Sequence, residues 1–189
     1  MVRHAALAAV AALVAGCAEQ ATEPDEIRTP LYSVEGTAEH QHATELSGSE
    51  EVPPRDTDAK GVAIFRERPG SDEVDFHLVT SKISNVHQAH IHCGAFGANG
   101  PIRMWLFPVI GPSGAALVHP DQLGSHTGVL NKGTFNPTGV TCPDGTPLID
   151  AMRAGLAYVN VHTTDGVGDP NTGPGDFPGG EIRGQLDRR

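Results

Sequence analysis

The sequence HQAHIHCGAFGANG occupies residues 87–100 and contains three of the chain's ten histidines and one of its three cysteines. His90 and His92 stand two positions apart, and side chains with that spacing project from the same face of a β-strand. Ala89 and Ile91 alternate with them and would face a hydrophobic core on the other side. The stretch therefore predicts a strand that carries two imidazoles side by side and leads into a glycine-rich turn.

The rest of the chain has the composition of a turn-rich globular protein. It has 189 residues, of which 38% are hydrophobic, with 23 glycines and 15 prolines, and this length suits one domain plus an export segment. The formal net charge of −10 argues against a nucleic-acid partner, because phosphate contacts need a basic surface. The same charge argues against adhesion to anionic lipid headgroups.

An export signal is predicted at the N-terminus, where a basic residue precedes an apolar run over residues 5–15 that is too short to span a bilayer. The run leads into VAGC (14–17), which resembles the lipobox of bacterial lipoproteins. We predict a signal peptide over 1–16, a lipid on Cys17 and a flexible acidic tether over 17–42. The protein would then be exported, on the periplasmic side or at the cell surface, and would touch the membrane only through this lipid. An ordinary secretory signal with an unrelated cysteine is the alternative.

The number of cysteines is consistent with an exported lipoprotein. If Cys17 carries lipid, Cys93 and Cys142 are left as a pair, and an oxidising compartment allows them to form a disulfide. Closing a loop of about 50 residues would stabilise the fold by about 4 kcal/mol if the effect lies in the entropy of the unfolded chain. Two free thiols, or a Cys93 that binds metal beside His92, are the alternatives.

Short apolar segments separated by turns recur from residue 43 onward. Strands are expected at 43–47, 61–66, 73–80, 83–93, 102–109, 124–132, 156–163 and 181–186. The segment at about 147–154 is the one expected helix, because Pro147 suits a first turn and Gly155 suits a stop. The pattern indicates an all-β fold, an antiparallel β-sandwich or barrel of Greek-key type with one short helix.

Five blocks of this region, in this order, resemble the CHRD domain, which is named after chordin, a secreted regulator of growth factors, and also occurs in bacterial exported proteins. The blocks are LSGSEEVPP (46–54), AHIHCG (89–94), NGPI (99–102), GLAYVNVHT (155–163) and PGGEIRGQL (178–186). The resemblance implies a compact β-rich domain over residues 43–187 that lies outside the cytoplasm, and it implies no particular reaction. The segment 165–177 makes the loop before the last block longer than is usual in the family.

A metal site is predicted from three histidines. If the strand that contains His162 lies beside the strand that contains His90 and His92, three imidazoles converge, and imidazole suits copper and zinc. Glu181 would either supply an oxygen ligand or hydrogen-bond to one of the metal ligands and so orient it. The alternative is a buried hydrogen-bond network of histidine and glutamate that fixes strand register without a metal, since imidazole serves both roles.

Other candidate ligands have weaker support. His87 lies three positions before His90 and would point elsewhere on a strand, so we expect it in a loop. His119 and His126 are loop candidates for a fourth ligand. The long loop offers carboxylates to calcium, but a solvated loop explains them more simply. These carboxylates belong to Asp165, Asp169 and Asp176.

The expected function is a binding or scaffolding module of the cell envelope without enzymatic activity, whose partner is an unidentified envelope or extracellular protein. The alternative is a copper-dependent redox enzyme, because His-x-His on a strand before a glycine-rich turn also resembles the copper strand of Cu/Zn superoxide dismutases. Hydrolase chemistry has little support, since no serine stands in a G-x-S-x-G motif.

Overall fold

The computed structural model describes residues 40–108 and 124–186. Within these ranges the chain forms eight strands of one antiparallel sheet, the short helix α1 (Leu148–Arg153) and the 3-10 turn η1 (Gly48–Glu50). The strands are β1 (Gln41–Ser47), β2 (Lys60–Glu67), β3 (Val74–Ser84), β4 (Val86–Cys93), β5 (Ile102–Phe107), β6 (Ser125–Phe135), β7 (Ala157–Thr163) and β8 (Ile182–Gln185). The predicted all-β fold is confirmed. The predicted signal peptide, Cys17 and nearly all of the predicted tether lie outside the described residues.

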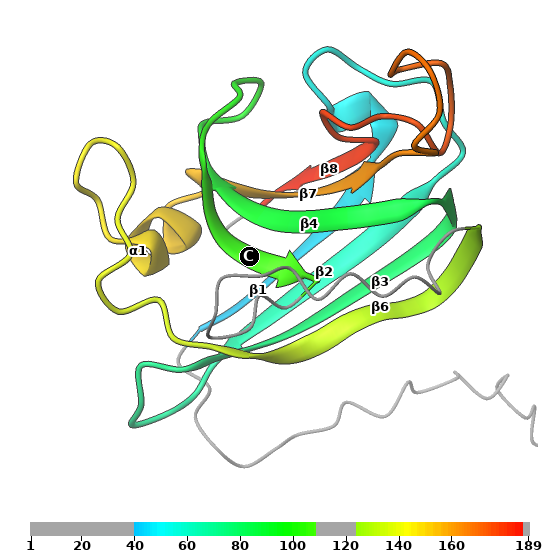
Figure 1. The fold of residues 1–189 in the computed structure, drawn as a ribbon. Helices are drawn as coiled ribbons and strands as arrows, with labels where there is room; N and C mark the ends of the chain where they lie inside the picture. The colour runs from blue at the N-terminus through cyan, green and yellow to red at the C-terminus, as the bar shows by residue number, and fades with distance from the viewer. Residues whose placement is uncertain (1–39, 109–123, 187–189) are drawn as a thin grey trace, which may run out of the picture. The chain divides into compact units, whose positions relative to one another are not determined.

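The sheet has the strand order β5-β4-β7-β8-β1-β2-β3-β6 (Figure 1). The last strand, β8, joins its two halves, because it pairs with β7 on one side and meets β1 at the pair Ser47–Arg183 on the other. The two edge strands approach each other, and Asn131 of β6 donates a hydrogen bond to the carbonyl of Leu106 in β5 at 2.6 Å. The sheet is therefore nearly closed. Of the two arrangements predicted, sandwich and barrel, it resembles the barrel.

The two faces of β4 and β7 differ in the way that the sequence predicts. Ala89 and Ile91 of β4 pack in the hydrophobic core with Val159 and Val161 of β7. All seven residues of β7 are buried, although its second face carries polar side chains. Loops must therefore cover that second face, and they create the buried polar site described below.

Several element boundaries differ from the prediction, and two of them bear on the packing of the sheet. β1 begins at Gln41 rather than at residue 43, because His42 is buried and its Nε2 lies 3.3 Å from Glu67 Oε1. The single strand expected at 83–93 is divided at Asn85, which has φ 55°, a conformation that asparagine tolerates better than most residues.

No helix among the described residues is long and apolar enough to cross a membrane.

Candidate metal centre

The pairing of β4 with β7 brings the three predicted histidines together. His90 lies opposite Asn160, and Gln88 lies opposite His162, so His90 and His162 are diagonal neighbours on one face and within reach of each other. His90 Nδ1 lies 3.1 Å from His162 Nε2. Among the described residues, His90, His92 and His162 are the one group of His, Cys, Asp or Glu side chains placed to hold a metal ion, with ligand atoms all within 4.8 Å of one another.

Backbone carbonyls fix the orientation of two of these rings. His92 Nδ1 lies 2.8 Å from the carbonyl oxygen of Gly100, and His162 Nδ1 lies 2.7 Å from that of Pro178. Because a carbonyl oxygen only accepts hydrogen bonds, both Nδ1 atoms carry the hydrogen and both Nε2 atoms keep a lone pair. Metal-binding histidines are commonly held by such an interaction through the other ring nitrogen.

The three rings are neutral at pH 7. Their exposed fractions are 0% for His90 and 7% for His92 and His162. Burial lowers the pKa of His90 to about 3, and the neighbouring imidazoles act in the same direction. Burial lowers the pKa of His162 to about 4 against the effect of its hydrogen bond to Pro178, and it also lowers the pKa of His92. A neutral imidazole is the form that binds metal.

The ring nitrogens have a spacing and a pairing that a metal ion could use. The 3.1 Å between His90 Nδ1 and His162 Nε2 fits a hydrogen bond, and it is also close to the separation of about 3.3 Å between two nitrogens on a tetrahedral ion with bonds of 2.0–2.1 Å. However, His92 Nε2 is buried with no hydrogen-bond partner among the described residues, which is rare for a polar atom. The three imidazoles are therefore placed so that they could hold a metal ion.

Aromatic side chains pack against the histidines. Tyr158 stacks on His92, with ring centroids 4.8 Å apart and planes 10° apart. The guanidinium of Arg183 lies 3.5 Å from the Tyr158 ring centroid, and Trp105 stands edge-on to His90 at 4.2 Å. These contacts restrict the rings, and reasoning from the sequence did not find them because they depend on strand register.

Glu181 is buried beside the centre but is bonded to other groups. Its carboxylate accepts hydrogen bonds from Thr57 Oγ1 at 2.6 Å, Thr163 Oγ1 at 2.7 Å and Gly175 N at 2.8 Å. The Thr163 hydroxyl in turn accepts a hydrogen bond from Phe177 N, next to Pro178. Glu181 therefore fixes the loop whose Pro178 carbonyl orients His162. The sequence predicted a direct contact of Glu181 with the metal or with a ligand, whereas here it acts through this loop.

A second buried carboxylate, Glu51, also lies at this site. Its Oε1 accepts a hydrogen bond from Asn160 Nδ2 at 3.2 Å, and burial raises the pKa of Glu51 to about 7 against the effects of Asn160 and Arg183. Gly180 has φ 125°, and a Cβ there would lie 2.3 Å from Glu51 Oε1, so glycine is required. Its place in the block at 46–54 is a signal in the sequence that pointed to Glu51.

The sequence model of the CHRD domain matches residues 42–169, more than half of the chain. The chain belongs to the CHRD family. No curated protein and no solved structure matches it detectably. The family match ends inside the loop that we predicted to be unusually long. β8 lies beyond that end and still pairs with β7 and β1, so the sheet of this CHRD domain extends past the matched residues.

Two of the weaker histidine predictions are wrong. His87 is not a loop residue of the CHRD domain but part of β4, because β4 begins at Val86. His126 lies in β6 and pairs with Ile83 of β3 rather than in a loop. His119 lies outside the described residues.

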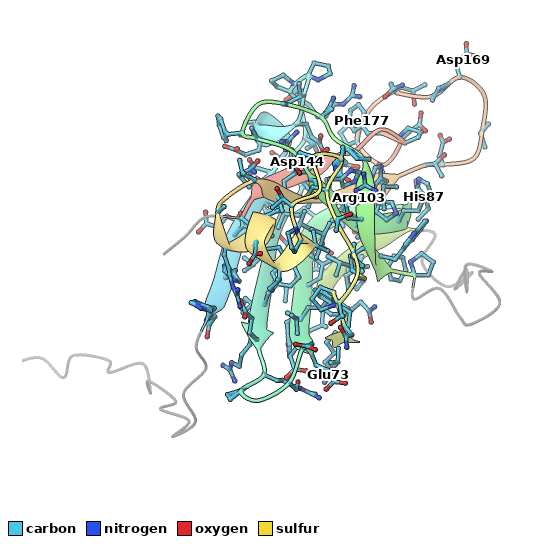
Figure 2. All side chains as sticks on the ribbon, turned by 90° about the vertical axis from the view of Figure 1, so that its left-hand side faces the viewer. Glu73, His87, Arg103, Asp144, Asp169 and Phe177 are labelled. Carbon is cyan, nitrogen blue, oxygen red and sulfur yellow. A yellow bond between two sulfur atoms is a disulfide. The ribbon has the colours of Figure 1, made fainter. Side chains whose placement is uncertain are left out.

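The acidic loop of the CHRD domain does not gather its carboxylates. Asp165 Oδ1 accepts a hydrogen bond from Val167 N, and Asp176 Oδ2 accepts two from Thr172. Figure 2 places Asp169 at the outer tip of the loop, away from Phe177, where the chain returns to the sheet. Local hydrogen bonds therefore explain Asp165 and Asp176, and the calcium alternative gains no support.

The predicted disulfide is present. Cys93 and Cys142 are bonded, with Cα atoms 5.7 Å apart and a sequence separation of 49. The bond ties the end of β4, directly after His92, to the segment that precedes α1. Because its sulfur is already bonded, Cys93 is not a metal ligand in this state of the CHRD domain.

Proposed function

We propose that this chain is a metal-binding module of the cell envelope that holds one copper or zinc ion through His90, His92 and His162. The observation that carries the proposal is the arrangement of three buried, neutral imidazoles whose ligand atoms lie within 4.8 Å of one another. Two of them donate through Nδ1 to backbone carbonyls, so each keeps a lone pair on Nε2. The apolar run and VAGC tetrad at the N-terminus support export and attachment through lipid on Cys17.

The resemblance to the CHRD family concentrates around this centre, which supports the same proposal. Each of the five sequence blocks contributes a group to the rings or to their nearest contacts. These groups are Glu51, His90 with His92, the Gly100 carbonyl, Asn160 with His162, and the Pro178 carbonyl. The blocks on which the resemblance rests thus include the residues that would build the metal centre.

We propose a binding or scaffolding role for this module, with an envelope or extracellular protein as partner, and not catalysis. A bound ion would cross-link β4 and β7 and satisfy His92 Nε2. Superoxide turnover is a poor fit, because rings with exposed fractions of 0–7% give a substrate little access. A net charge of −10 also repels an anionic substrate.

The test is a titration of the full-length chain with Cu(II) and with Zn(II) in the presence of a competing chelator. We expect one ion per chain, loss of that binding in His90→Ala, and unchanged binding in His77→Ala, whose ring is exposed on β3. The proposal would be contradicted if the parent chain did not bind a stoichiometric ion, or if His90→Ala bound it as the parent does. Superoxide turnover by the copper-loaded chain above that of free copper would instead favour the redox alternative.

A further inference from the structure

A fourth imidazole lies beside the centre. His87 is half-buried on β4, and its ring centroid lies 6.1 Å from that of His162 with the planes 73° apart. Figure 2 shows His87 on the strand, near the end of the sheet where Phe177 lies and far from Glu73. In this conformation His87 stands next to the group of three rather than within it.

A β-bulge explains why this histidine faces the centre. A residue three positions before His90 in a regular strand would point to the opposite face. Val86 pairs with Thr163 and Gln88 pairs with His162, so two steps along β4 correspond to one step along β7, and His87 is the extra residue. Bulges re-aim side chains and are frequent beside functional sites.

The ring of His87 also has an unused nitrogen. Its Nε2 is buried and has no hydrogen-bond partner among the described residues, like Nε2 of His90 and of His92 on the same strand. A buried imidazole nitrogen without a partner is costly unless something binds it, and Nε2 of His87 and of His92 are both in that state.

We propose that His87 is the fourth ligand of the metal, and that it completes a tetrahedral set of four imidazoles with His90, His92 and His162. This inference rests on the proposed function. His87 is the most exposed of these four residues, so it lies on the solvent side of the proposed set. Four protein ligands make a closed site, which suits metal retention rather than catalysis at an open position.

The test is X-ray absorption spectroscopy of the Zn(II)-loaded full-length chain. We expect four imidazole ligands in the parent, and three imidazoles with one oxygen in His87→Ala. The affinity of that variant should fall by at least about tenfold, the smallest loss commonly seen when even an outer partner of a metal site is mutated. Added imidazole should restore the four-nitrogen spectrum in His87→Ala, and His77→Ala serves as the matched control.

The outcomes separate this inference from the proposed function. Three imidazoles in the zinc-loaded parent, or a His87→Ala variant with parent-like spectrum and affinity, would overturn the role of His87 and leave the three-histidine centre in place. A parent chain that binds neither zinc nor copper would overturn both. The ligand number of the parent is decisive by itself, so the test does not depend on the folding of any variant.

Discussion

Thr163 stands where β7 ends and the loop over the histidines begins. Its side chain is fully buried, with an exposed fraction of 0%. The hydroxyl donates to Glu181 Oε2 at 2.7 Å and accepts from Phe177 N at 3.0 Å. One hydroxyl thus satisfies a buried carboxylate and a buried backbone N–H, and a buried group left without its partner costs about 1–3 kcal/mol.

We predict that Thr163→Val lowers the free energy of unfolding by about 2 kcal/mol or more, for this reason, and weakens metal binding by loosening the Pro178 carbonyl. Urea denaturation and the chelator titration measure the two effects. Thr80→Val is the matched control, since Thr80 is 1% exposed and its Oγ1 has no hydrogen-bond partner among the described residues. Equal stability of the two variants would contradict the prediction.

At the scale of elements, the sheet depends on the contact between β8 and β1. The β1–β8 ladder consists of the single residue pair Ser47–Arg183. Beside it, at Gly184, the backbone of β8 approaches that of β1 unusually closely. A Cβ on Gly184 would lie 2.2 Å from the carbonyl oxygen of Glu45 and 2.6 Å from Thr44 Oγ1. A side chain there must push β1 away from β8.

Gly184→Ala should therefore destabilise the protein by about 1–3 kcal/mol, the usual cost of overpacking, and should shift Arg183 and Gln185 of the same strand. Thermal unfolding gives the first effect, and a weaker metal affinity reports the second. Gly133→Ala in β6 is the control, because its Cβ would meet only the ring of Phe76, at 3.2 Å. A variant at Gly184 as stable as the one at Gly133 would argue against this close contact.

The elements were largely predictable because most strands alternate. In β7 the apolar residues face the core and Tyr158, Asn160 and His162 face the loops, so a period of two was enough to place His162. The bulge at His87 was not predictable, because it exists only in the pairing of β4 with β7. The Pro178 carbonyl was missed for a similar reason, since the path of a loop over the sheet depends on distant contacts.

At the scale of the whole molecule, buried histidines and a buried glutamate have opposite effects on how the stability of the fold depends on pH. Burial lowers the pKa values of His87, His90, His92 and His162, so the unfolded chain binds more protons below pH 6.5 and the fold loses stability as pH falls from there. Glu51 acts in the other direction. Its pKa is raised by burial to about 7, so the folded chain keeps a proton that the unfolded chain releases.

Replacement of Glu51 by Gln isolates the second effect, because Gln does not titrate and keeps an oxygen for Asn160 Nδ2. The stability that protonated Glu51 contributes is present below pH 4.5 and is lost as pH rises through about 7. Between pH 4 and pH 8 the free energy of unfolding of the parent should therefore fall relative to that of Glu51→Gln, by on the order of 3 kcal/mol. Urea denaturation of both metal-free proteins at the two pH values measures this difference, and the histidines cancel because both chains contain them. Parallel pH dependence of the two proteins would show that Glu51 has the same pKa in the folded chain as in the unfolded chain, near 4.5, and hence that water reaches its carboxylate.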